Sequence, residues 1–396
     1  MSGVNLTKES LAFLQDQFRS YYKKSDLSVP DRFSRREYAF VFFGGKGMLR
    51  HLGFSKKKQF QAFLQKKAPM HAYYSTAYYQ YPDAPRMNEK EWMGAELIFD
   101  LDADHLPDAD NITYETQLEL VKIEFIKLVD DFLMNDFGFP IESMELYFSG
   151  GRGYHCHVKH PSVYQLSSGD RREIVDYITG RDLNASVVFH EESMGRAQIK
   201  GKTVSTGKRL RMPKPDEPGW RGRISQGLID ILEDIVQSND PLLKLKGYGV
   251  SEYTAKKLLD DLSENRILRI KQGHLDQSTT IRRFFLNNAL RKKAVSFAAG
   301  ETDEPVTCDV KRLIRLPGSL HGKTGFKVIP VSLDTLDDFD PLSEAVIFDK
   351  TPVLVDVGVD VTVTLKKETF ELTTGNQEVP LFVAVFLLGK KLANIK

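Results

Sequence analysis

The stretch GAELIFDLDADH, residues 94–105, runs from apolar positions into carboxylates at Asp100, Asp102 and Asp104. If it forms a strand, Asp100 and Asp102 share one face with Ile98, because side chains alternate with a period of two. Carboxylates beside apolar neighbours repel each other strongly at low dielectric unless cations neutralise them. A solvated strand end is the ordinary alternative, since Asp is mostly a surface residue. The apolar AELIF before the acids favours a buried strand, so the pattern predicts a divalent metal site.

The chain has 396 residues, a formal net charge of +1 and the composition of an ordinary globular protein. Single cores usually stop growing at roughly 250–300 residues, so we expect one large domain with a smaller lobe. The sequence becomes basic and rich in Pro and Gly near residue 201, and helical patterns follow as far as residue 273. We therefore predict a core formed by residues 1–200 and 274–396, with residues 201–273 as an inserted small helical lobe.

Only two cysteines are present, which excludes a disulfide framework and suits a reducing compartment. The N-terminal MSGVNLTKES has no signal-peptide pattern. The longest apolar run, PLFVAVFLLG at residues 380–389, is shorter than the about 20 residues that span a bilayer and predicts a buried helix. We expect a cytoplasmic protein with no membrane contact. Because the net charge is small, any contact with nucleic acid must come from a local basic patch.

Two amphipathic helices are predicted on either side of the Asp-rich strand. LTKESLAFLQDQFRSYY, residues 6–22, has an apolar stripe that includes Phe18 and Tyr21, with Thr7 as a plausible N-cap. YETQLELVKIEFIKLVDDFLMNDFGFP, residues 114–140, predicts a longer helix that a Gly and a Pro end.

A glycine-rich turn between two predicted strands, YFSGGRGYHCHV at residues 147–158, carries Ser149, Arg152 and His155. Backbone N–H groups of such a turn can face an anion and Arg152 adds a fork of donors, so the turn is interpreted as a triphosphate cradle. A hairpin turn with a surface arginine is the ordinary alternative. A zinc site at His155 and His157 is disfavoured, because the cysteine between them points to the other strand face and no C-x-x-C is present.

A third segment, DEPVTCDVKRLIRLPGSLHGKTGFKV at residues 303–328, holds Asp303, Arg315, His321 and Lys323 within a short span. Its Pro and Gly residues favour a tight loop in which backbone and cations can surround a phosphate. A helix with a solvated basic face would account for the cations near position 311. It would not account for the loop RLPGSLHGKTG.

Taken together, these segments resemble the small catalytic subunit of archaeal and eukaryotic-type DNA primase. The resemblance spans nearly the whole chain, and its specificity comes from the ordered set of motifs. The motifs are REYAF (36–40), YYSTAYYQYP (73–82), ELIFDLDADH (96–105), SGGRGYH (149–155), DEPVTCD (303–309) and RLPGSLHGKTG (315–325).

The resemblance implies an α/β fold of the primase type: two mixed β-sheets flanked by helices, with the catalytic cleft between them and the helical lobe to one side. It implies three catalytic, metal-binding carboxylates, which fall on Asp100, Asp102 and Asp303, with Asp309 as an alternative third acid. The implied triphosphate ligands are Arg36, Ser149, Arg152, His155, Arg315 and His321.

Two departures from the family pattern change these expectations. Members often carry a structural zinc knuckle built on cysteines after the D-x-D strand, yet ADHLPDADNITYE at residues 103–115 has none. Structural zinc is therefore predicted to be absent, and a partial site that uses His105 stays open. Gly151 stands where some relatives have a second arginine, so the cradle would have one guanidinium group fewer to bind the triphosphate.

The resemblance implies template-directed nucleotidyl transfer, namely synthesis of short RNA primers, or DNA primers as well, on single-stranded DNA for replication. The implied cofactors are two Mg²⁺ or Mn²⁺ ions, which suit an all-oxygen site. The implied partners are a large subunit in a heterodimer, the template and nucleoside triphosphates. Template contact is assigned to Lys200, Lys202, Lys208, Arg209, Arg211 and Arg221. An equal alternative is that these residues form only the charged, solvated surface of a helical lobe.

Two functions from other classes stay open. A metal-dependent nucleotide phosphohydrolase could use the same acids with His155 or His157, but it has no need of the loops that fit a triphosphate. A non-catalytic nucleic-acid-binding subunit would keep its function without Asp102.

Overall fold

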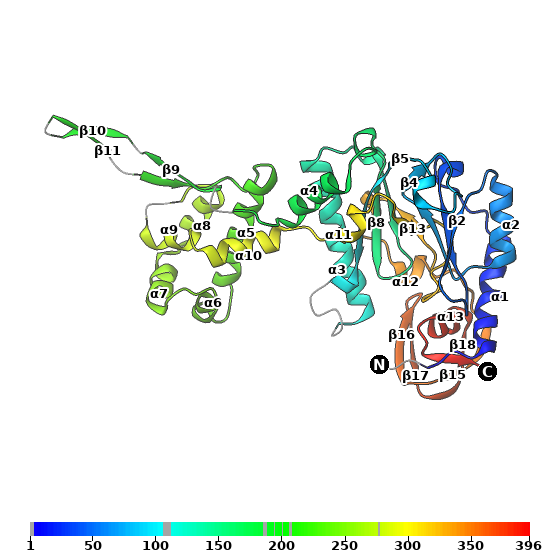
Figure 1. Ribbon diagram of the computed structural model, residues 1–396. Coiled ribbons are helices and arrows are strands. Elements are labelled where there is room, and N and C mark those ends of the chain that lie inside the picture. The colour runs from blue at the N-terminus through cyan, green and yellow to red at the C-terminus, as the bar shows by residue number, and fades with distance from the viewer. Residues whose placement is uncertain are drawn as a thin grey trace. The chain divides into compact units, whose positions relative to one another are not determined.

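The computed structural model describes residues 4–105, 112–184, 188–193, 195–199, 201–205, 208–275 and 278–396. The chain divides into two compact units, which are described separately (Figure 1). Unit 1 comprises Met1–Val129, Phe139–Val175 and Thr302–Lys396, and unit 2 comprises Asp130–Gly138 and Asp176–Glu301. The segment expected as an inserted lobe lies within unit 2. All residues expected to bind metal or triphosphate belong to unit 1.

The first sheet of unit 1 has the strand order β13-β3-β1-β2. A glycine-rich turn at residues 44–47 joins two of its strands, and Arg315 pairs with Tyr73. This pairing brings the segment 303–328 beside a strand from the first quarter of the chain. The strands are β1 (Tyr38–Val41), β2 (Met48–Leu52), β3 (His71–Ser75) and β13 (Leu313–Arg315).

The second sheet has the order β14-β7-β8-β6. The expected hairpin is confirmed, and its second strand pairs with the Asp-rich strand so that His155 lies opposite Asp100 and Gly153 opposite Asp102. The strands are β6 (Leu97–Asp102), β7 (Met144–Phe148), β8 (Gly153–Val158) and β14 (Ile329–Val331).

The α/β class is confirmed, with two main sheets flanked by helices. All pairings between the described strands of both sheets are antiparallel, whereas mixed sheets were expected. Hairpins account for two of these pairings, β1–β2 and β7–β8, because a tight turn can join only antiparallel neighbours.

The two predicted amphipathic helices are present. α1 (Lys8–Lys24) begins after Thr7, whose side chain accepts a hydrogen bond from the backbone N–H of Ser10 at 3.1 Å. Its buried stripe passes through Phe18 to Tyr22 and not through Tyr21, which is half-buried and donates to a backbone carbonyl. α3 (Tyr114–Lys127) continues into a π-helical segment, Leu128–Asp136. The remaining elements of unit 1 before the C-terminal region are α2 (Lys57–Lys67), β4 (Ala77–Tyr79), β5 (Trp92–Ala95) and α11 (Glu304–Cys308), while α4 (Ser168–Thr179) passes from unit 1 into unit 2.

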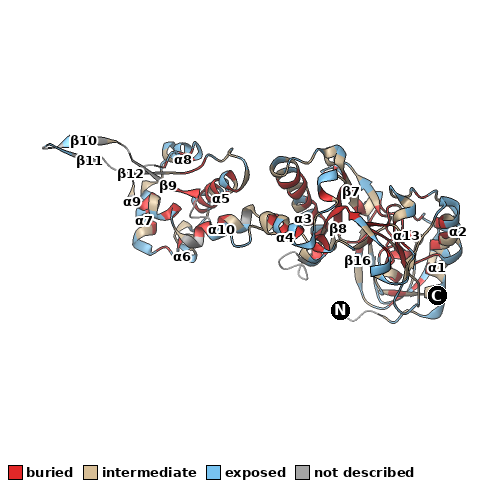
Figure 2. Ribbon diagram, turned by 45° about the horizontal axis from the view of Figure 1, so that its top comes forward, coloured by how far each residue is buried: buried red, intermediate tan, exposed pale blue. Residues whose placement is uncertain are grey.

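The C-terminal region packs small sheets around a buried helix. α13 (Leu381–Gly389) buries every residue from Phe382 to Leu388, which confirms the helix predicted from the apolar run (Figure 2). No helix in the described part of the chain combines the length and apolar character of a membrane span. The surrounding elements are α12 (Pro341–Glu344), β15 (Pro352–Val357), β16 (Val361–Leu365), β17 (Glu368–Leu372), β18 (Gly375–Pro380) and β19 (Ala393–Ile395).

Unit 2 is mainly helical, as the sequence predicts, but it also contains short strands. Two antiparallel pairs form, β10 with β11 and β12 with β9. Composition did not predict them, because they are only four residues long and one pairing joins separate segments. The elements are β9 (His190–Ser193), β10 (Arg196–Ile199), β11 (Lys202–Ser205), β12 (Lys208–Arg211), α5 (Gly219–Val236), α6 (Pro241–Gly247), α7 (Glu252–Asp261), α8 (Glu264–Lys271), α9 (Thr279–Phe285) and α10 (Asn288–Ala298).

Candidate active site

β6 presents two carboxylates on one face. Leu97, Phe99 and Leu101 are buried, whereas the side chains of Asp100 and Asp102 keep 21% and 35% of their surface exposed. The alternation predicted from the sequence is confirmed. Both acids are held by a rigid paired strand and remain accessible to a ligand.

Asp100 is paired with His155 across the β6–β8 ladder. The Nε2 atom of His155 lies 3.3 Å from Oδ1 of Asp100. Burial alone would raise the pKa of this carboxyl, but the nearby charges of His155, Arg312 and Arg315 lower the pKa below its usual value. Asp100 is therefore ionised at neutral pH.

The pKa of Asp102 is shifted in the opposite direction, above its usual value. Burial raises the pKa of its carboxyl, and the like charges of Asp104 and Asp100 add to the rise, although Arg152 opposes them. Arg152 forms an ion pair with Asp104, and its Nη2 atom lies 3.5 Å from Oδ1 of Asp102. A bound divalent cation would offset the repulsion between the Asp100 and Asp102 carboxylates.

The turn at residues 149–153 lies directly beside the acids. Gly150 has a φ of +75°, and a Cβ atom on it would lie 2.9 Å from the Cβ of His321. Glycine therefore allows both the turn and the close approach of the HGKTG loop, residues 321–325. The backbone N–H of Gly151 donates to Oγ of Ser149 at 3.2 Å, which orients that hydroxyl within the turn.

The HGKTG loop is tied to this turn by hydrogen bonds. Thr324 donates its hydroxyl to the carbonyl of Gly150 at 2.6 Å, and Nδ1 of His321 lies 3.1 Å from the same hydroxyl oxygen. The pKa of His321 is well below its usual value because the ring is buried and the cations of Arg315, Lys390 and Lys323 are close. His321 thus sits in a strongly positive environment, where a phosphate would be favoured.

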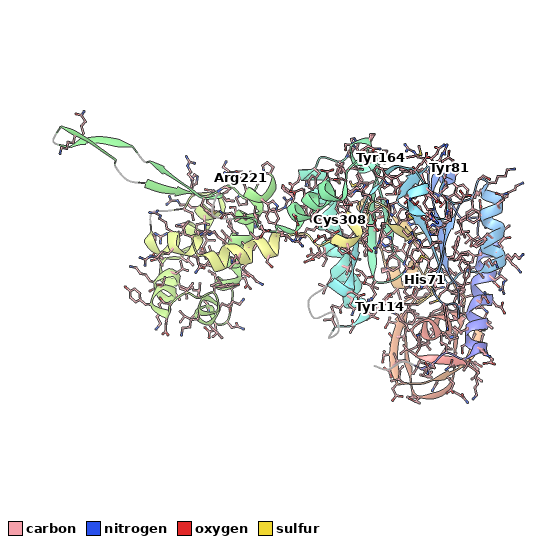
Figure 3. All side chains as sticks on the ribbon, in the orientation of Figure 1. His71, Tyr81, Tyr114, Tyr164, Arg221 and Cys308 are labelled. Atoms are coloured by element: carbon pink, nitrogen blue, oxygen red, sulfur yellow. The ribbon has the colours of Figure 1, made fainter. Side chains whose placement is uncertain are left out.

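Arg315 is positioned by His71, a residue that the motifs did not single out. Nη1 of Arg315 donates to Nδ1 of His71 at 2.8 Å, and the backbone N–H of Gly322 donates to the same atom at 3.2 Å. Burial lowers the pKa of His71 to about 3, with Arg315 and Lys323 contributing, so the ring is a neutral acceptor. No sequence pattern marks His71, which is labelled in Figure 3, because its role depends on the pairing of β3 with β13.

Arg36, which was expected to bind triphosphate, has its side chain buried among other partners in this structure. Its side chain has no exposed surface. Its donors reach the side chains of Asp31, Glu96 and Tyr78 and backbone carbonyls that include that of Ser75. All five guanidinium N–H groups thus have acceptors inside the protein. The sequence could not distinguish a buried arginine from a ligand-binding one, because all its partners except Asp31 come from separate segments.

Asp303 lies next to Asp100 through the backbone. Its N–H donates to the carbonyl of Asp100 at 3.0 Å, and its carboxylate caps α11 by accepting from the N–H of Val306 at 3.2 Å. Asp309, the alternative third acid, accepts from the N–H of Lys311 at 2.9 Å. Among the described residues, no three His, Cys, Asp or Glu side chains form a ready metal-binding group.

The donor chemistry nevertheless fits a hard divalent cation. The Asp100 and Asp102 carboxylates lie on one face, and the backbone holds a third acid, Asp303, beside them. Oxygen ligands of this kind suit Mg²⁺ and Mn²⁺. The prediction that structural zinc is absent stays a prediction. Residues 106–111, in the middle of the segment concerned, lie outside the described residues.

The basic residues assigned to template contact all belong to unit 2. Lys202 is exposed on β11, Lys208, Arg209 and Arg211 are on β12, and Lys200 lies outside the described residues. Arg221, on α5, forms an ion pair with Glu217 at 2.9 Å. Their role in template contact therefore remains a proposal.

Lys390 is a further cation near the site that sequence reasoning missed. Its Nζ atom lies 4.4 Å from the centroid of the Tyr114 ring, and the Tyr114 hydroxyl donates to the carbonyl of Gly151. Burial and the charges of Arg152 and Lys323 lower the pKa of Lys390 to about 8. A lysine directly after an apolar helix is also the ordinary cation at a helix C-terminus, so the sequence offered no specific signal.

Comparison with known proteins agrees with this geometry. The family model described as DNA primase small subunit matches residues 99–333. Proteins named DNA primase small subunit PriS are similar over nearly their whole length: that of Methanosarcina acetivorans is 41% identical, with 98% of this chain and 97% of the relative covered. That of Methanosarcina barkeri is 43% identical, with 96% and 95% covered, and that of Picrophilus torridus is 40% identical, with 95% and 96% covered. The chain therefore belongs to the DNA primase small-subunit family.

Proposed function

We propose that this chain synthesises short primers on single-stranded DNA by template-directed transfer of nucleotides from nucleoside triphosphates. It would thus act as a DNA-directed RNA polymerase of the primase type, with deoxyribonucleotides as a second class of substrate. One observation carries the proposal: two partly exposed carboxylates, Asp100 and Asp102, share a strand face beside a cationic turn and a cationic loop. Membership of the primase family supports the same reading.

The acids would hold two Mg²⁺ or Mn²⁺ ions. Asp100 and Asp102 are the first ligands, and Asp303 is the third. Bound divalent cations lower the pKa of the attacking 3′-hydroxyl and stabilise the pyrophosphate leaving group. The backbone N–H of Asp303 donates a hydrogen bond to the carbonyl of Asp100. Asp303 can therefore contribute if its carboxylate leaves the N–H of Val306, which it caps, and rotates toward Asp100.

The cationic side chains would bind and orient the triphosphate. Ser149 and Arg152 approach from the glycine turn, His155 from β8, and Arg315 and His321 from the segment 303–328. Arg315 is held in place by the neutral His71 ring. Preorganised donors of this kind stabilise charge that develops during transfer, so their loss should slow the reaction as well as weaken nucleotide binding.

The term "small subunit" in the names of the relatives supports a separate large subunit as the partner of this chain. We propose a heterodimer with that chain, a single-stranded DNA template and a cytoplasmic site of action. The basic strands β11 and β12 of unit 2 are proposed as the template contact.

The test is primer synthesis on a single-stranded template with labelled nucleotides and Mg²⁺ or Mn²⁺, in the presence and absence of the large subunit. Asp102→Asn should abolish dinucleotide and longer products while the protein stays folded. Asp356→Asn is the matched control, because Asp356 is an exposed acid on β15. Release of nucleoside diphosphate or monophosphate without extension would instead indicate a phosphohydrolase. Template binding that persists without any synthesis by the heterodimer would indicate a non-catalytic subunit.

A further inference from the structure

A cavity of about 510 Å³ in unit 1 lies beside the HGKTG loop. Its lining combines apolar residues, which include Leu11, Phe42 and Phe43, with Lys323 and Lys390. Apolar neighbours lower the local dielectric, which strengthens the attraction between the lysines and an anion. The cavity therefore has the character of an anion-binding pocket.

This cavity borders directly on the expected triphosphate site. Gly322, which lines it, follows His321 and donates its N–H to His71. On the other side, a Cβ atom on Gly389 would lie 2.8 Å from the backbone carbonyl of Lys323. The end of α13 is therefore packed against the HGKTG loop, and the two lysines are carried by adjoining segments.

Lys390 also connects the cavity to the glycine turn. Its Nζ atom lies over the Tyr114 ring, and Tyr114 is hydrogen-bonded to Gly151. Arg152 is already paired with Asp104. In the described part of the chain, neither Lys323 nor Lys390 forms an ion pair with a carboxylate. Among the described residues, the two lysines are thus cations without an ion-pair partner at the edge of the expected triphosphate site, and the carboxylates of Asp102 and Asp104 act on Lys390 only from a distance.

We propose that this cavity is a subsite for inorganic pyrophosphate, with Lys390 and Lys323 as its ligands. The inference rests on the proposed function, in which the 3′-hydroxyl passes its proton to water, its oxygen bonds to the α-phosphorus, and the bond from that phosphorus to the β-phosphate oxygen breaks. The electron pair of the broken bond leaves with pyrophosphate, which carries several negative charges. Pyrophosphate then moves from the side chains that held the triphosphate to the lysines beyond His321.

The experiment measures the affinity of the full chain for inorganic pyrophosphate by calorimetry, and inhibition of primer synthesis by added pyrophosphate. Lys390→Met and Lys323→Met should each weaken pyrophosphate binding about tenfold, the effect of losing one charge-assisted contact. Lys390→Arg should retain most of the affinity, because the cation remains. The matched control is Lys58→Met, which removes an exposed lysine of α2 that does not line the cavity.

A pyrophosphate affinity within twofold of the unmodified protein for both methionine variants would overturn the proposal. The melting temperature of each variant, compared with that of Lys390→Arg, separates loss of binding from loss of folding. The two proposals fail differently. If the unmodified heterodimer makes no primers, the proposed function is wrong; if primers are made and both variants respond normally to pyrophosphate, only the subsite is wrong.

Discussion

Arg36 and Arg152 were both expected to bind triphosphate, but the structure places them in opposite environments. The Arg36 side chain is fully buried and paired with the equally buried Glu96, whereas the Arg152 side chain is 30% exposed and pairs with the largely exposed Asp104. Arg36→Met should therefore lower stability with little effect on nucleotide affinity. Arg152→Met should weaken nucleotide binding with little effect on stability.

The magnitudes follow from burial. Removing Arg36 leaves the Glu96 carboxylate buried with His157 and Tyr78 as its hydrogen-bond partners. Breaking a buried pair in this way costs about 3–5 kcal/mol of unfolding free energy. The exposed pair of Arg152 with Asp104 is worth at most about 1 kcal/mol. Loss of the Arg152 contact to phosphate should cost about 1.5–3 kcal/mol of binding, a rise in KM of roughly tenfold to a hundredfold.

The assay is urea unfolding followed by tryptophan fluorescence. The chain has two tryptophans, Trp92 in unit 1 and Trp220 in unit 2, so a Trp220→Phe background reports on unit 1 alone. With a slope of about 2 kcal/mol per M urea, the midpoint should fall by about 1.5–2.5 M for Arg36→Met and by no more than about 0.5 M for Arg152→Met.

The reasoning is refuted if Arg36→Met is as stable as Arg152→Met, or if its KM for nucleotide rises as much. Should Arg36→Met fail to fold, Arg36→Lys provides the same comparison. Lysine keeps the charge but cannot reach all the acceptors of the guanidinium, so an intermediate loss of stability is expected.

Three further predictions concern the acids, the turn and the buried histidine. Asp303→Asn should abolish primer synthesis with little change in melting temperature, because Asn also caps a helix, whereas Asp309→Asn should stay active. Gly150→Ala should weaken nucleotide binding and destabilise the protein more than Gly138→Ala, measured by KM and urea midpoint; both glycines have φ near +70°, but only at position 150 would the new methyl group meet His321. The pKa of His71 is lowered to about 3, so between pH 6.5 and 3 the unfolded state binds more protons and stability is lost as the pH falls, by up to about 1.4 kcal/mol per pH unit. His71→Gln should reduce this slope in acid titrations followed by circular dichroism, and an unchanged slope would assign the sensitivity to other groups.

Local sequence patterns were enough to predict the strand face of Asp100 and Asp102, the β7–β8 hairpin and the buried α13. Alternation, turn chemistry and apolar periodicity depend on neighbours within a few residues, so the sequence contains the whole signal. The same patterns placed Tyr21 on the buried stripe of α1, whereas Tyr22 is the buried residue. After Phe18 the stripe of a helix can continue at either the third or the fourth residue, and periodicity does not decide between them. The short strands of unit 2 were missed because each is only four residues long and because β9 pairs with the more distant β12.

The sequence by itself determined the family and the kinds of side chain that the site requires. The tertiary structure decided which of those side chains meet. Arg36 is buried because Glu96 and Tyr78 come from other segments to surround it, together with the nearby Asp31. His71 and Lys390 enter the site through strand pairing and through packing of the C-terminal helix. The physical reason is that burial and charge environment depend on contacts between distant segments, which no local pattern records.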